Sequence, residues 1–550
     1  MVSTHKYPEA MQKSIELVKE TRIRRQGVEP KKMNLEEREE ILIKFHPDYK
    51  EGVKRSVLIG ANKGDLMSNE VADLLESEPL INVEDIDLSR IDYDVDILLI
   101  GGGGAGIIAS LWAFYSGIEL ENILVVTKLR LGDSNSKMSQ GGIQAAVTPD
   151  DSPTIHYLDA IGGGHFTNKP EIVETLVKNA PEIIAWHEKL GVMYDKYEDG
   201  TFLLNPGGGT SRDRLLSCKD YTGLEIVRVL MDEFHNSGIP FLEFTSAVEL
   251  LMDEEGKASG AILYDMETRE YFVARSKATI LVTGGFGRLH IQDFPTTNHY
   301  GATADGLVLA YRVGAKLRDL DAVQYHPTGS AYPEQIVGLL CTEKLRGMGA
   351  QPVNKHGELF VHPLEPRDVE SAALLRECYE KGNGIETPTG MIGVWLDIPM
   401  IDLLNGEGTI EERFSAMYIK YKRFDIDITE DPVLVFPTIH YQNGGVEINK
   451  NTETTVPGLF AAGEVTGGVH GKNRLMGNSI LDYNVFGKIA GINASEYAKK
   501  TKIGKLTLDH VKNWKNTLEK EGITTRRKAP MLLPEYRGEK TLSKLKSYLL

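Results

Sequence analysis

The sequence predicts an α/β fold in which one α/β domain is interrupted by a second, α+β domain. Three observations predict it. Residues 95–128 follow a strand, glycine turn, helix and strand pattern. Residues 323–433 differ from this pattern in composition, with more proline and isolated helical runs. An apolar strand and a long helical run then return after residue 434. The pattern therefore predicts a discontinuous domain, 93–322 with 434–497, around an inserted segment.

The bulk composition describes a globular protein. The chain has 550 residues, of which 41% are hydrophobic and 26% charged, so it can bury sizeable cores. Its formal net charge is −17, which makes nucleic acid or an anionic membrane surface improbable as a main partner. If the substrate is an anion, the positive charges that bind it must be local.

The cysteines indicate whether the chain can bind a metal or a cluster, and the first residues indicate in which cell compartment we expect the protein. Cys218, Cys341 and Cys378 are far apart and form no C-x-x-C, so the sequence predicts no metal site and no cluster of its own. Few cysteines are typical of a reducing cytoplasm. The first residues have no apolar core of a signal peptide, and we expect a cytoplasmic protein without direct membrane insertion.

Residues 1–92 form a charged, mainly helical N-terminal extension. Asn34 and Glu37 have the spacing of a capping box before "REEILIKF", which predicts a helix start. Two interpretations of this extension stay open: a solvated appendage, or an arm that docks a partner.

The stretch "ILLIGGGGAGIIASLWAFYSGI" (97–118) carries no charge and is long enough to cross a bilayer. Its run of glycines, Gly101–Gly104, argues against a continuous helix, because each glycine costs a helix interior roughly 1 kcal/mol. The better interpretation is a buried strand, "VDILLI", a glycine turn, and a helix that ends at Gly117.

That interpretation places Gly101, Gly103 and Gly106 in a G-x-G-x-x-G register. The first glycine makes the tight turn, the second admits a pyrophosphate, and the third lets the helix pack on the strand. A second strand, "ILVVTK" (123–128), follows at the expected distance, so we predict a dinucleotide site. This strand ends in Thr127 and Lys128 instead of an acid, which leaves the choice between FAD and a nicotinamide cofactor open.

The remaining elements follow in order. Two β-rich segments lead from residue 240 to a second glycine turn at Gly284–Gly287. The inserted domain occupies 323–433. The segment "GLFAAGEVTGG" and a helical run over 477–500 complete the first domain. Residues 498–550 form a short, basic, helical C-terminal region, with "TTRRKAP" as a loop.

Five short motifs lie outside the first glycine turn: "QYHPTG" (324–329), "LCTEKLRGMG" (340–349), "EPRD" (365–368), "PTIHYQNGG" (437–445) and "HGKNRLMGNSI" (470–480). Taken singly, each motif can be explained without a function, as a histidine in a loop or a charge on the surface. Together, and in this order, the chain resembles the flavoprotein subunit of the fumarate reductase and succinate dehydrogenase family, which includes L-aspartate oxidase. The resemblance runs from about 93 to 497 and also covers "SQGGIQAAV", "TGGFGRL", "GATADG" and "AAGEVTGGVHG".

The resemblance implies a Rossmann-like FAD-binding domain (93–322 and 434–497) with an inserted capping domain (323–433). It also implies that FAD is the cofactor, which makes Thr127 and Lys128 acceptable. The implied FAD-binding residues are Gly101, Gly103, Gly104, Gly106, Thr127, Lys128, Ser134, Asn135, Ser136, Gln140, Gly141, Gly142, Thr283, Gly284, Gly285, Asp305, Glu464, Asn478 and Ser479.

The family's dicarboxylate site maps onto His326, Thr328, Thr342, His440 and Arg474. The resemblance implies that Arg474 and His440 hold one carboxylate and that Thr342 and His326 hold the other. It implies hydride transfer from flavin N5, and a proton delivered by Arg367 through a relay of Glu343 and Arg346 to solvent. The alternative for Arg367 is that it only anchors the substrate.

Asn135 stands where many respiratory members carry a histidine bonded covalently to the flavin. Asparagine cannot form that bond, so we expect non-covalent FAD and favour fumarate reduction over succinate oxidation. Electrons would come from a separate iron-sulfur subunit, or from a small donor to a stand-alone enzyme. L-aspartate oxidase, a reductase of another enoate such as a substituted fumarate, and a non-catalytic flavin conduit remain alternatives.

Overall fold

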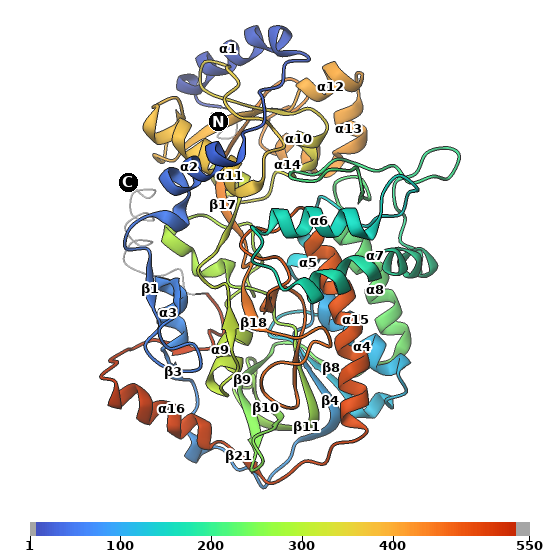
Figure 1. The fold of residues 1–550 in the computed structure, drawn as a ribbon, viewed down its shortest axis with the longest axis vertical. Coiled ribbons are helices and arrows are strands. Elements are labelled where there is room, and N and C mark those ends of the chain that lie inside the picture. Colours follow the sequence, from blue (N-terminus) through green and yellow to red (C-terminus); the bar gives the residue numbers. More distant parts are fainter. Residues whose placement is uncertain (1–6, 535–550) are drawn as a thin grey trace.

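The computed structural model describes residues 7–534 and arranges them around two β-sheets (Figure 1). The larger sheet lies in the lower half of Figure 1, with strand order β21-β9-β10-β11-β4-β5-β8 and β19 beside β11. Strands β4, β5, β8, β11 and β19 are parallel, and β9, β10 and β21 pair antiparallel at one side. These strands are β4 (Tyr93–Ile100), β5 (Ile123–Val126), β8 (Phe241–Leu242), β9 (Thr245–Asp253), β10 (Ala258–Asp265), β11 (Tyr271–Leu281), β19 (Leu459–Ala461) and β21 (Leu506–Thr507).

The uncharged stretch around residue 100 is a strand, a turn and a helix. Strand β4 is central in the sheet, and its second half, residues 97–100, is buried on both faces, which explains the continuous apolar run there. Helix α4 (Gly104–Tyr115) follows the turn, and Gly117 just after it has φ +81°, the left-handed conformation expected of a C-terminal glycine. No helix within residues 7–534 is long and apolar enough to span a membrane.

Helices cover the face of the larger sheet toward the right of Figure 1. Helix α15 (Asn478–Ala498) packs on α4 and on α7 (Pro170–Leu190), and α8 (Thr222–Ser237) lies beside them. A Cβ atom on Gly491 would lie 2.3 Å from the Ala109 carbonyl oxygen, so glycine in α15 permits the close approach of α4.

The second sheet lies above the first and is antiparallel, with strand order β13-β17-β16-β14 and β15 beside β16. Its strands are β13 (Gln324–Ser330), β14 (Gln351–Val353), β15 (Ile385–Glu386), β16 (Ile392–Asp397) and β17 (Val433–Tyr441). Strand β17 belongs to this sheet although most of it follows residue 433. The domain boundaries expected from the sequence stay a prediction.

Short strands and helices complete the fold. Small sheets are formed by β12 (Leu317–Arg318), β18 (Gly445–Glu447) and β20 (Thr466–Gly467), by β6 (Ile143–Gln144) with β7 (Leu215–Leu216), by β1 (Lys54–Ser56) with β2 (Leu66–Ser68), and by β3 (Glu78–Pro79) with β22 (Lys528–Ala529). The other helices are α1 (Glu9–Arg25), α2 (Leu35–Phe45), α3 (Asn69–Leu75), α5 (Asn135–Met138), α6 (Pro153–Gly163), α9 (Asp305–Arg312), α10 (Lys344–Gly347), α11 (Arg367–Leu375), α12 (Met400–Asn405), α13 (Thr409–Arg413), α14 (Ser415–Lys422) and α16 (Asp509–Lys520).

The N-terminal extension is packed into the protein. Met11, Ile15 and Val18 of α1 are buried in the main hydrophobic core. Helix α2 begins with the expected capping box, because Asn34 Oδ1 accepts from Glu37 N and Glu37 Oε2 accepts from Asn34 N. The described part of the extension is therefore not a solvated appendage, and its role as a docking arm stays a prediction. In the C-terminal region, 535–550 lie outside the described residues.

Candidate active site

A cavity of about 470 Å³ lies between the two sheets, and residues from the strands and loops of both sheets line it. Its volume is typical of a site for a small molecule or cofactor. The larger sheet and its helices contribute sixteen of the expected FAD residues: Gly101, Gly103, Gly104, Thr127, Lys128, Ser134, Asn135, Ser136, Gln140, Gly141, Gly142, Thr283, Gly284, Asp305, Glu464 and Ser479. The residues expected to bind the substrate or to transfer the proton, and that line the same cavity, are His326, Thr342, Glu343, Arg367, His440 and Arg474.

The glycine turn has the geometry that the motif requires. Gly101 has φ +125°, and a Cβ atom there would lie 2.2 Å from the Val282 carbonyl oxygen. A Cβ atom on Gly106 would lie 2.0 Å from the Gly101 carbonyl oxygen, so Gly106 supports the turn without lining the cavity. The first residue of α4, Gly104, lines the cavity, and the helix N-terminus is available to a phosphate.

The second strand ends in a lysine that is paired with an acid from elsewhere in the chain. Lys128 Nζ donates to Asp305 Oδ2 at 2.7 Å and to Thr303 Oγ1 at 2.6 Å. Asp305 is the first residue of α9 and lines the cavity. A carboxylate is thus present beside the end of β5, although the strand itself does not supply it.

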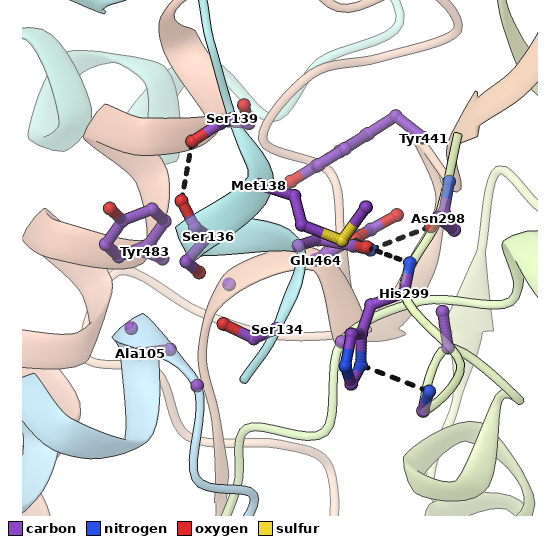
Figure 2. A pocket seen from close by; sticks show the side chains of 18 of the residues that line it. Ala105, Ser134, Ser136, Met138, Ser139, Asn298, His299, Tyr441, Glu464 and Tyr483 are labelled. Atoms are coloured by element: carbon purple, nitrogen blue, oxygen red, sulfur yellow. Dashed lines mark hydrogen bonds between the residues drawn. The ribbon is translucent and has the colours of Figure 1, made fainter. Parts of the chain in front are cut away.

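Asn135 is held in a polar cluster on one side of the cavity. Its Nδ2 donates to Asn298 Oδ1 at 2.7 Å, and its Oδ1 accepts from His299 N at 2.6 Å. Glu464 accepts from Asn135 Nδ2 at 3.3 Å, and burial raises the pKa of Glu464 to about 7. Figure 2 shows Asn298, His299 and Glu464 across the view from Ala105 and Tyr483.

The unpartnered polar atoms of this part of the cavity, an acceptor and a hydroxyl group, fit FAD. Gln140 Oε1 and Tyr483 Oη are buried, line the cavity and have no hydrogen-bond partner within the described part of the chain. Buried polar atoms without partners are costly unless a ligand satisfies them. Two expected residues lie behind the wall instead: Asn478 Oδ1 contacts His156 Nε2, and Gly285 lies against Glu464.

Arg367 is the first residue of α11 and enters the cavity from the second sheet's side. Its Nε donates to Glu343 Oε2 at 2.7 Å, and its Nη1 donates to Gln324 Oε1 at 3.0 Å. Burial lowers the pKa of Arg367. Burial acts to raise the pKa of Glu343, but Arg367 and Arg346 outweigh it and the pKa lies below its usual value. Glu343 is therefore the ionised partner of Arg367.

Arg474 is a buried cation whose guanidinium forms no ion pair within residues 7–534. Arg474 is 2% exposed. Among the described residues its Nη1 donates only to the Leu475 carbonyl oxygen, at 3.2 Å, and its Nε has no partner. The guanidinium carbon lies 4.3 Å from the centre of the Tyr441 ring. Burial, with Arg367 nearby, lowers the pKa of Arg474 to about 9. A buried unpaired charge is costly, so this position favours an anionic ligand.

His326 and His440 are neutral neighbours, with ring centres 5.0 Å apart. Burial and then Arg367 lower the pKa of both rings well below the usual value. His326 Nδ1 accepts from Thr328 N at 3.2 Å, which places the proton of the neutral ring on Nε2. His326 Nε2 has no partner among the described residues, so it can donate to a ligand. Thr328 thus orients His326 and does not itself line the cavity.

Arg346 lies behind the cavity wall and is fully buried. Its Nη2 is 3.5 Å from Glu343 Oε2, and its Nη1 contacts Glu370 and the Pro363 carbonyl oxygen. Burial raises the pKa of Glu370 to about 8. Arg346 therefore connects Glu343 to the buried carboxyl group of Glu370, and the relay to solvent expected from the sequence stays a prediction.

Sequence reasoning missed several polar residues of the site. Gln324 contacts both Arg367 and Arg474. Its Oε1 accepts from Arg367 Nη1, and its Nε2 donates to the Arg474 carbonyl oxygen at 2.7 Å. Thr297 Oγ1 lies 2.7 Å from His440 Nδ1, and Lys420 also lines the cavity. Gln324 stands inside the "QYHPTG" motif, so the sequence carried a signal for it. No local pattern marked Thr297, Lys420 or Glu370.

Comparison with known proteins places this cavity in a family. Residues 96–480 match the model of the FAD binding domain family. The chain belongs to this family. It is similar to an uncharacterized FAD-dependent oxidoreductase of Methanocaldococcus jannaschii, with 40% identity over 74% of this chain and 72% of the relative. It is also similar to one of the subunits of the CoM/CoB fumarate reductase of Methanothermobacter marburgensis, with 37% identity over 74% of this chain and 73% of the relative. The L-aspartate oxidase of Nostoc is 35% identical over 73% of this chain and 68% of its own length.

A solved structure supports the same fold. The Escherichia coli quinol fumarate reductase FrdA superposes with a TM-score of 0.70 and 29% identity, covering 78% of this chain and 74% of that chain. This member of the FAD binding domain family is therefore an FAD-dependent oxidoreductase, related to fumarate reductases, succinate dehydrogenase flavoproteins and L-aspartate oxidases. The α/β fold and the FAD cofactor expected from the sequence are confirmed.

Proposed function

We propose that this chain reduces fumarate to succinate, as a flavoprotein subunit that receives electrons from a separate iron-sulfur subunit. The observation that carries the proposal is Arg474, a buried cation with no ion-pair partner among residues 7–534, in the cavity that the glycine turn also lines. Arg367, two neutral histidines and Thr342 line the same cavity. A dianion needs about two cations and several neutral donors to replace its water, and this set supplies them.

The chain's own side chains bind and orient the substrate. Arg474 and His440 hold one carboxylate, and His326 Nε2 with Thr342 holds the other. Bound FAD, when reduced, supplies the hydride. Because both histidines are neutral, the charge that polarises the substrate comes from the arginines.

Arg367 donates the proton to the substrate carbon. It is reprotonated through Glu343, a carboxylate that accepts a proton from Arg346 behind it and passes that proton to Arg367. An arginine with an unperturbed pKa above about 12 is a weak acid. Burial lowers the pKa of Arg367, and Glu343, Arg346 and Glu370 form a continuous buried chain behind it. A positioned acid of this kind typically contributes about 10²- to 10⁴-fold in rate.

The electron source and direction rest on sequence features and relatives. The three cysteines stand far apart in sequence, and the Methanothermobacter relative is itself one subunit of a fumarate reductase. Asn135 occupies the place where a covalent flavin histidine would stand, which favours reduction of fumarate.

One comparison tests the proposal. The purified protein is assayed without oxygen for oxidation of reduced viologen on addition of fumarate, and separately for iminoaspartate formation from L-aspartate. We expect the first activity and not the second. Iminoaspartate formation without fumarate reduction would identify an L-aspartate oxidase instead, and the absence of both would favour a non-catalytic flavin conduit or another enoate.

A further inference from the structure

The N-terminal extension lies outside the part of the chain that matches the FAD binding domain family, yet it touches both sheets. The family match begins at residue 96. In Figure 1 the blue segment starts at α1 beside the second sheet, passes α2 next to α11, and continues down to α3 and β3 near the larger sheet. Helix α2 packs directly on α11, the helix that begins with Arg367.

The first part of the extension is fastened to the second sheet by buried groups. Arg22 Nη2 and Arg25 Nη2 donate to the two oxygens of Asp397 at 2.8 and 2.6 Å, and the side chain of Asp397 is fully buried. Trp395 Nε1 donates to Ser14 Oγ at 2.9 Å. These contacts lie at β16 and involve none of the residues that line the cavity.

The middle of the extension is fastened to a second buried carboxylate, that of Glu365. Met33 N donates to Glu365 Oε1 at 2.6 Å, and Arg38 donates to Glu365 Oε2 from Nε at 2.9 Å and from Nη2 at 2.7 Å. Glu365 is 1% exposed, whereas the side chain of Arg38 is 27% exposed. One buried oxygen is therefore held by a backbone group and the other by a two-pronged guanidinium.

Glu365 is separated from Arg367 by a single proline. Pro366 has φ −53° and caps α11, so the backbone between Glu365 and Arg367 has little freedom. Arg367 is the first residue of the helix, and its guanidinium must reach Glu343, Gln324 and the cavity at once. A shift of the Glu365 side chain would move the start of α11 and with it Arg367.

The extension is also anchored beyond Arg38. Asp48 Oδ2 accepts from Val323 N at 2.9 Å, next to β13. Asn62 exchanges two hydrogen bonds with the backbone of Leu317, at 2.7 and 2.8 Å. Arg38 thus stands on a segment fixed on both sides of it.

We propose that Arg38 is a positioning residue for Arg367, acting through Glu365, and that the extension serves the reaction by this contact. The inference rests on the proposed function, since it assigns Arg38 to the delivery of a proton by Arg367. A misplacement of about 1 Å in a catalytic group can cost on the order of 10²-fold in rate.

Arg22 provides a matched control. Arg22 and Arg38 both belong to the extension and donate to a buried carboxylate near the second sheet. Among residues 7–534, each carboxylate keeps one other donor when its arginine is removed: Arg25 for Asp397 and Met33 N for Glu365. We expect Arg38→Ala to lose at least about tenfold in kcat for fumarate reduction with little change in KM, and Arg22→Ala to keep kcat near that of the wild type. Arg38→Lys should recover part of the loss. FAD content and the unfolding midpoint are measured for each variant.

A double-mutant cycle with Arg367→Lys separates positioning from general damage. If Arg38 acts through Arg367, adding Arg38→Ala to Arg367→Lys should cost little further activity. The inference is overturned if the two losses multiply, if Arg38→Ala and Arg22→Ala behave alike, or if Arg38→Ala only raises KM. If the wild-type protein does not reduce fumarate, the proposed function is refuted and this inference with it. If the wild type is active, Arg367→Lys has a low kcat and Arg38→Ala has a kcat near that of the wild type, only the positioning role is refuted.

Discussion

Replacing Arg367 by lysine separates its two assigned tasks. The guanidinium donates from Nε to Glu343 at 2.7 Å and from Nη1 to Gln324 at 3.0 Å while it lines the cavity. Lysine keeps the positive charge but carries its protons on one nitrogen at the end of a flexible stem, so it cannot reproduce the separate Nε and Nη1 donors that hold Glu343 and Gln324. We therefore expect substrate binding to suffer modestly and proton delivery to fail.

The magnitude follows from the role of a positioned acid. General-acid contributions of about 10²- to 10⁴-fold correspond to about 3 to 5 kcal/mol of transition-state stabilisation. Arg367→Lys should thus lose at least about a hundredfold in kcat for fumarate, with KM little changed and FAD retained. Initial rates of viologen oxidation over a range of fumarate concentrations give both constants. A near-normal kcat with a raised KM would make Arg367 an anchor, and His326 would be the first group to test as the proton donor.

Three further outcomes are expected. Arg474→Lys should raise KM at least as much as it lowers kcat, because Arg474 clamps a carboxylate in ground and transition states alike; steady-state kinetics beside Arg367→Lys check this, and a pure kcat effect contradicts it. Acid precipitation should release all flavin as FAD, since Asn135 cannot bond to it, whereas flavin fluorescence on the polypeptide in a denaturing gel would show a covalent link. His165 Nε2 lies 2.6 Å from Asp368 Oδ2, and that contact raises the pKa of His165 although burial, and then Lys472 and Arg38 nearby, oppose it. Its stabilisation is fully present below about pH 6.5 and is lost as pH rises through the raised pKa. The gap in unfolding midpoint between wild type and His165→Gln should therefore shrink with rising pH, and a constant gap would mean that the histidine does not titrate in this contact.

The sequence alone predicted the features that depend on a few neighbouring residues. The capping box at Asn34, the turn at Gly101 and the helix end at Gly117 were predicted correctly, because backbone conformation and helix capping are local. Ordered motifs also pointed to most of the predicted site residues that line the cavity, including Arg367 and Arg474, because a shared family pattern carries that information along the chain.

Only the tertiary structure decided which charges are paired. The contacts of Lys128 with Asp305, Arg346 with Glu370 and Arg38 with Glu365 join different elements. The motif around Arg474 indicates its place in the site, but only the structure shows that its guanidinium is buried with no acidic partner within residues 7–534. Periodicity and composition report the environment of a residue along its own helix or strand. The partners of a buried charge come instead from segments up to hundreds of positions away, and the cost of burying it is set by that three-dimensional environment.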